Sequence, residues 1–140
     1  AAEEHARQDE EKRRERALLI RYPNRARHDH ERAEALRQIN EVIRTAEKRL
    51  VDIAEERKRI EAELEFYRRN PAKVPAPLRR QLDDNARATL AQKDFIADKE
   101  AEKTRIHARF DEELVRLQQL WAAAGSPAAA QAASAPPASR

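Results

Sequence analysis

The chain has 140 residues, and its composition excludes most compact folds. Charged residues make up 39% of it and aromatic residues 4%, with a single glycine and no cysteine. So few aromatic side chains do not fill a compact core of this length, and one glycine does not supply the turns of a β-sandwich or an α/β sheet. A highly charged, alanine-rich chain is typical of long helices and coiled coils, or of disorder.

The charges are nearly balanced, with 29 Lys and Arg against 26 Asp and Glu, and the two signs alternate along the chain. Nucleic-acid-binding proteins usually concentrate basic residues on one face, whereas alternating signs are typical of a solvated helix surface. The absence of cysteine excludes disulfides and thiolate catalysis. No apolar run approaches the roughly 20 residues that a transmembrane helix needs.

Residues 1–21 are predicted to form a charged N-terminal helix. Between residues 2 and 21 there is no Gly or Pro, and opposite charges fall four residues apart, as in Glu3 with Arg7. Each such pair stabilises an exposed helix by a few tenths of a kcal/mol, roughly. Pro23 then interrupts the helix, and Asn24 is the expected N-cap of the next one.

A heptad pattern, typical of a coiled coil, follows between residues 24 and 70. Two series with a spacing of seven residues are apolar or aromatic at every position but one. Their members are Leu36, Ile43, Leu50, Arg57 and Leu64, and Ile39, Ala46, Ile53, Ile60 and Tyr67. The exception, Arg57, either lays its aliphatic stem along this seam or sets the register of the helix pair.

Residues 24–121 as a whole are expected to form an elongated antiparallel helical hairpin. Residues 70–77 hold three prolines and predict the turn, and residues 78–121 predict a second helix with a weaker apolar stripe. Folding about Lys73 would place Leu64 opposite Leu82 and Leu50 opposite Ile96. Residues 122–140 are rich in Ala, Ser and Pro, with Gly125 as a helix stop, and are expected to be a disordered tail.

No catalytic residue, cofactor or metal site is predicted. His28 and His30 are two residues apart on a helix, so their side chains point in different directions and are expected at the surface. The densest group of large apolar residues comprises Leu18, Leu19, Tyr22, Leu117 and Trp121. This group is either a small core at the end of the hairpin or an exposed patch for a partner or a second copy.

A bacterial family shows the same succession of features. The string Arg16-Ala17-Leu18-Leu19-Ile20-Arg21-Tyr22-Pro23 leads into a helix up to Glu65-Phe66-Tyr67, then a Pro-rich turn and a helix ending near Leu120-Trp121. Over residues 12–121 this resembles the C-terminal coiled-coil region of uncharacterised envelope proteins, which typically have a signal peptide and a small β-rich N-terminal domain of unknown function. The resemblance implies secretion across the inner membrane and transfers no catalytic residue. A start at Ala1 without Met fits signal-peptide cleavage or a fragment.

The function expected from these features is that of a non-enzymatic coiled-coil module, structural or protein-binding, in the bacterial periplasm or envelope. Its partner would be another protein or a second copy of the chain, since a two-helix hairpin has a limited core. The alternatives are a helical protein that binds nucleic acid or the ribosome, and a peripheral protein of the membrane surface. The cytoplasm is the alternative location.

Overall fold

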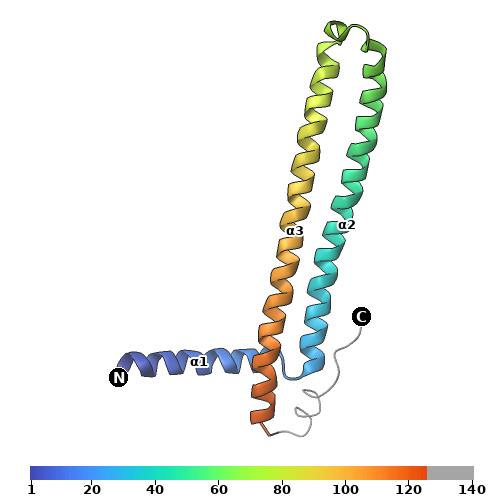
Figure 1. The fold of residues 1–140 in the computed structure, drawn as a ribbon. Coiled ribbons are helices and arrows are strands. Elements are labelled where there is room, and N and C mark those ends of the chain that lie inside the picture. The colour runs from blue at the N-terminus through green and yellow to red at the C-terminus, as the bar shows by residue number, and fades with distance from the viewer. Residues whose placement is uncertain (126–140) are drawn as a thin grey trace. The chain divides into compact units, whose positions relative to one another are not determined.

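The computed structural model describes residues 1–125, and this part of the chain is all-α, without strands. It contains three α-helices: α1 (Ala2–Arg21), α2 (Arg25–Leu64) and α3 (Ala76–Ala123) (Figure 1). Two short 3₁₀ helices, η1 (Glu65–Tyr67) and η2 (Pro71–Lys73), connect α2 to α3. A helical hairpin with an additional N-terminal helix confirms the expected fold class. The expected disordered tail began at residue 122, but Ala122 and Ala123 belong to α3, and residues 126–140 lie outside the described residues.

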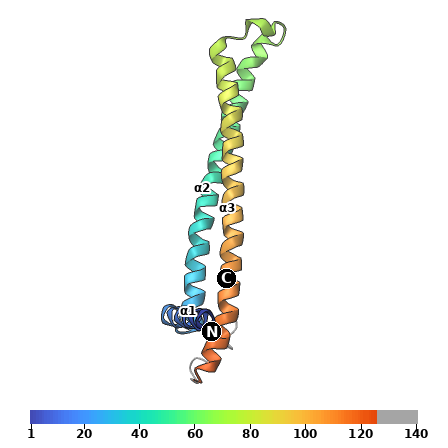
Figure 2. The same cartoon turned by 90° about the vertical axis from the view of Figure 1, so that its left-hand side faces the viewer.

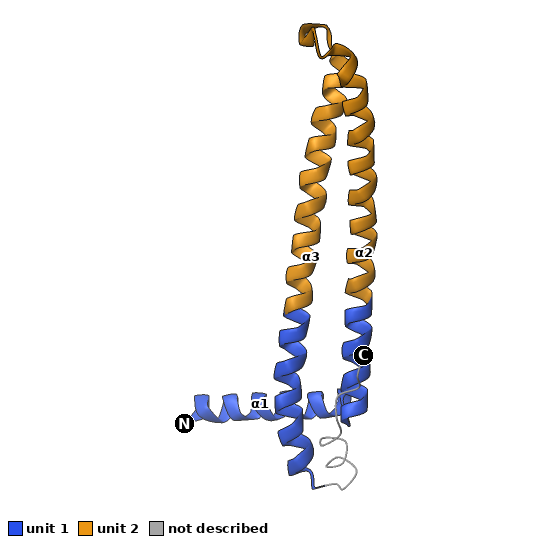
Figure 3. Ribbon diagram, turned by 45° about the vertical axis from the view of Figure 1, so that its right-hand side comes forward, with its two compact units in different colours: residues 1–37, 105–140 blue, residues 38–104 orange. Residues whose placement is uncertain are grey.

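The chain divides into two compact units, each containing a stretch of both long helices (Figure 3). Unit 1 combines residues 1–37 with the part of α3 that begins at Arg105, and unit 2 comprises residues 38–104. Within each unit the α2 and α3 segments run in opposite directions, as two perpendicular views show (Figures 1 and 2). The antiparallel topology that the short turn predicted is therefore present in both units.

The helix ends follow local sequence signals. α1 ends at Arg21, just before Pro23, and α2 begins at Arg25. The side-chain Oδ1 of Asn24 accepts a hydrogen bond from the backbone N–H of Arg27 at 2.9 Å, which confirms Asn24 as the N-cap. At the other end α3 stops at Ala123, and Gly125 adopts a left-handed φ of 68° that suits a residue without Cβ.

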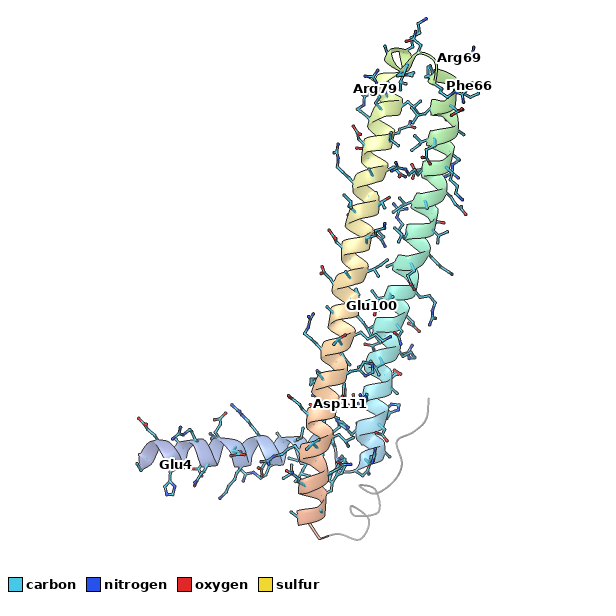
Figure 4. All side chains as sticks on the ribbon, viewed as in Figure 1. Glu4, Phe66, Arg69, Arg79, Glu100 and Asp111 are labelled. Carbon is cyan, nitrogen blue, oxygen red and sulfur yellow. The ribbon has the colours of Figure 1, made fainter. Side chains whose placement is uncertain are left out.

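The connection in unit 2 begins earlier than expected. α2 ends at Leu64, and the chain stays helical through Tyr67 only as the tighter η1 turn. α3 begins at Ala76, where the Pro75 carbonyl accepts the N–H of Leu78 at 3.1 Å. The Arg79 guanidinium also donates to the Ala72 carbonyl at 3.3 Å, tying the connection to the first turn of α3 (Figure 4).

The buried residues of unit 2 confirm the heptad phase of α2. Its buried apolar side chains all belong to the two predicted series in α2 or to the first turn of α3: Ile39, Ile43, Ala46, Ile53, Ile60 and Leu78. Val51, off the seam, is 57% exposed. Arg57 is also exposed, and its guanidinium lies 3.8 Å from the Glu61 carboxylate, so its charged end is at the solvent side of the seam.

The expected register between the helices is wrong by about one heptad. Asn85 Nδ2 donates to the Ile53 carbonyl at 2.9 Å, and Gln92 Nε2 donates to the Ala46 carbonyl at 3.0 Å. Folding about Lys73 would place Lys93 opposite Ile53, so the observed partner Asn85 lies eight residues nearer the turn, because the connection is centred near Asn70. A shift of about one heptad leaves seam positions facing seam positions, so the heptad spacing alone does not distinguish the two registers.

Candidate interaction surfaces

The five residues of the predicted apolar cluster come together in unit 1. Tyr22, Leu117 and Trp121 form a buried core at no more than 1% exposure, and Leu18 and Leu19 pack partly buried against it. The Trp121 indole N–H donates to the Tyr22 carbonyl at 3.0 Å, which joins α3 to the link between α1 and α2. Burial of the Trp and Tyr side chains leaves little of this cluster for a partner to contact.

α1 is attached to unit 1 through its C-terminal half. Arg116 on α3 forms ion pairs with Glu11, at 2.9 Å, and with Glu15. No residue of α1 is buried, and the ion pair of Arg7 with Glu4 is local to its exposed first half. Exposed ion pairs contribute about 0–1 kcal/mol each, so the apolar contacts of Leu18 and Leu19 contribute more to holding α1.

The expectation of surface histidines is wrong for His28, although His30 is exposed. The His28 side chain is fully buried, its ring edge-on to Tyr22 at 4.7 Å and tilted against Phe110 at 5.1 Å. Its Nε2 lies 3.1 Å from Glu113 Oε1. The link before α2, α2 itself and α3 meet around this ring. The buried face of α2 is therefore wider here than the two heptad positions on which the prediction was based.

Burial raises the pKa of the Tyr22 phenol above its ordinary value of 10.0, and the nearby negative charge of Glu113 adds to the shift. A raised pKa in the folded state means that this group stabilises the fold fully below about pH 10 and progressively less as the pH rises toward the folded-state pKa.

The free energy of unfolding should therefore fall above pH 10. Denaturation at several alkaline pH values tests this, and a Tyr22→Phe variant should show a weaker fall than the natural chain.

Asn85 is the buried polar residue of the unit 2 seam. It is 4% exposed, and its Oδ1 has no hydrogen-bond partner in the structure. A buried polar side chain in a coiled-coil seam favours one register because only that register satisfies its hydrogen bond, and it does so at a cost in stability.

Replacing Asn85 by leucine should therefore raise the free energy of unfolding by about 1–2 kcal/mol, because an unsatisfied buried oxygen is removed. Without the amide, the register displaced by one heptad becomes accessible, and amide resonances of unit 2 should double in NMR spectra. Asn70→Leu, at an exposed position of the connection, is the matched control and should change the stability by less than about 0.5 kcal/mol. A loss of stability at position 85 would contradict this role.

Unit 2 has an open groove of about 690 Å³ along α2 and α3. Its lining residues are Gln38, Glu41, Val42, Thr45, Ala46 and Arg49 from α2, and Gln92 and Phe95 from α3. Val42 and Phe95 are 41% and 42% exposed, and the Lys99 ammonium lies 5.4 Å from the centre of the Phe95 ring. The groove is therefore lined by apolar side chains, Val42, Ala46 and Phe95, together with the charged Glu41 and Arg49.

This groove was not predicted from the sequence, although a signal for it is present there. Gln38, Val42, Thr45 and Arg49 repeat at heptad spacing beside the main seam, and Phe95 lies off the apolar stripe of its helix. In the observed register Val42 and Phe95 come to the same level of unit 2. The displaced register would have separated them, so the sequence pattern alone did not bring the two residues together.

Within residues 1–125 no helix is long and apolar enough to cross a membrane. The same part of the chain has no group of three or more His, Asp or Glu side chains placed to hold a metal ion. Comparison of the chain with protein-family models, with curated proteins and with solved structures gives no match.

Proposed function

We propose that the chain is a non-enzymatic coiled-coil module that binds protein through the unit 2 groove, in the bacterial envelope. The observation that carries this proposal is that two partly exposed apolar side chains, Val42 and Phe95, line the same groove, whereas the other exposed apolar residues of unit 2, such as Val51 and Leu90, lie outside it. Aromatic side chains at the centre of an exposed patch are the usual anchors of protein interfaces.

The spacing along the groove favours a helical partner over a small ligand. Val42, Thr45 and Arg49 follow one another at intervals of three and four residues, which is the spacing that receives the side chains of another helix. Helices in bundles of three or more use a second stripe of this kind beside the first. An isolated helix pair needs only the main seam.

The envelope location depends on the resemblance of residues 12–121 to envelope proteins, and cell fractionation tests it. The natural protein should appear in the periplasmic or envelope fraction. Recovery in the cytoplasm alone would contradict the location and would leave the binding role to be tested separately.

The binding role is tested by a photo-cross-linking amino acid placed at Phe95 in cells. Covalent adducts with protein should form at position 95, because the groove would be occupied by a partner. Val51 is the matched control, since it is similarly apolar and exposed in unit 2 but does not line the groove. Absence of any protein adduct at position 95, or equal yields at positions 51 and 95, would overturn the proposal. So would adducts that consist only of nucleic acid or lipid.

A further inference from the structure

We infer that the occupant of the unit 2 groove is a second copy of this chain, docked so that α2 lies antiparallel to α2 of the second copy. This inference rests on the proposed function and names its partner. Two oppositely charged residues of the groove lining, Glu41 and Arg49, lie four residues before and four residues after Thr45, as a two-fold symmetric contact centred on Thr45 requires.

Charge complementarity along α2 supports the antiparallel arrangement. Glu41 precedes Thr45 by four residues, and the cationic pair Lys48 and Arg49 follows it by three and four. Under two-fold symmetry at Thr45, Glu41 of each copy faces Arg49 of the other, with Lys48 one residue away, so the attraction occurs twice. A parallel arrangement of the two α2 helices would place Glu41 against Glu41 and Arg49 against Arg49, and like charges would repel.

The centre of the groove fits the same symmetry. Thr45 is small and exposed, so two copies of α2 can approach closely there. On α3, Phe95 lies within about one helical turn of the level of Thr45, because Gln92 bonds to the carbonyl of Ala46. A two-fold axis at the level of Thr45 therefore lies close to Phe95 as well. It brings the Phe95 rings of the two copies together, where they exclude water. The result is a four-helix arrangement of two hairpins.

The first test uses single cysteines, because the chain has no cysteine of its own. Under mild oxidation Thr45→Cys should give a disulfide-linked dimer, since position 45 meets itself at the two-fold axis. Val51→Cys, exposed on another face, should remain monomeric under the same conditions. Equal cross-linking at the two positions, or none at position 45, would overturn the inference.

The second test measures the dimer dissociation constant of the intact chain by sedimentation equilibrium. Phe95→Glu should weaken the dimer at least about tenfold, while Leu90→Glu, on the same helix and 64% exposed but outside the groove, should change it little. Glu41→Arg alone should also weaken it, and Glu41→Arg combined with Arg49→Glu should restore it. All these positions are exposed, so circular dichroism should show unchanged helicity.

A chain that stays monomeric at every concentration, or a double charge exchange that fails to restore association, would overturn the inference. That failure is distinct from failure of the proposed function. If the adducts at position 95 contain only a different protein, the binding role is supported and the second copy is excluded as the occupant of the groove. Absence of all protein adducts at position 95 removes the binding role itself.

Discussion

Replacing Trp121 by alanine should lower the free energy of unfolding by about 3–5 kcal/mol, the largest loss expected from any single substitution in the described residues. Trp121 is 1% exposed and packs with Tyr22 and Leu117, so truncation leaves a cavity where three segments of unit 1 meet. It also removes the hydrogen bond from the indole N–H to the Tyr22 carbonyl. Urea denaturation followed by circular dichroism, at one fixed protein concentration, measures the loss.

Trp121→Phe separates packing from hydrogen bonding. It keeps an aromatic ring in the core but leaves the Tyr22 carbonyl without its indole donor, so it should cost less than Trp121→Ala. Phe66→Ala is the surface control, because Phe66 is 87% exposed and should lose less than about 0.5 kcal/mol. A cost at Trp121 no larger than that at Phe66 would show that the unit 1 core does not form as described.

The second large effect is expected in the middle of the unit 2 seam. Ile53 is 3% exposed, so Ile53→Ala should cost about 2–5 kcal/mol through lost burial and the cavity left behind. Val51, two residues away and 57% exposed, should lose less than about 1 kcal/mol on the same truncation. Denaturation of the two variants under identical conditions gives the comparison. Equal losses at Ile53 and Val51 would mean that the heptad phase of α2 is wrong.

The break before α2, the end of α3 and the buried face of α2 could be predicted because they depend on local signals, whereas the end of α2 at Leu64 was not predicted. Pro23 disrupts the helix through its ring and missing N–H, Asn24 caps the next helix, and Gly125 supplies a left-handed residue. The heptad spacing around Ile53 requires one face of α2 to be buried, whichever helix covers it. These features need no knowledge of how far one helix is displaced along the other.

The register and the surfaces that depend on it could not be predicted in the same way. A displacement of about one heptad keeps seam positions facing seam positions, so only specific polar contacts such as Asn85 to Ile53 distinguish the alternatives. The burial of His28 depends on contacts with Tyr22, in the link before α2, and with Phe110 of α3, which no periodicity in α2 reveals. The groove is lined by Val42 and Phe95, which are distant in sequence. They lie at the same level of the helix pair only in the observed register.

The proposed docking surface exists only if α2 and α3 pair in the observed register, and an NMR measurement tests this directly. In isotopically labelled protein, the side-chain amide protons of Asn85 should exchange slowly and show nuclear Overhauser effects to protons of Ile53. Overhauser effects between Ile53 and Lys93 instead, as folding about Lys73 would give, would contradict the register and with it the groove formed by Val42 and Phe95.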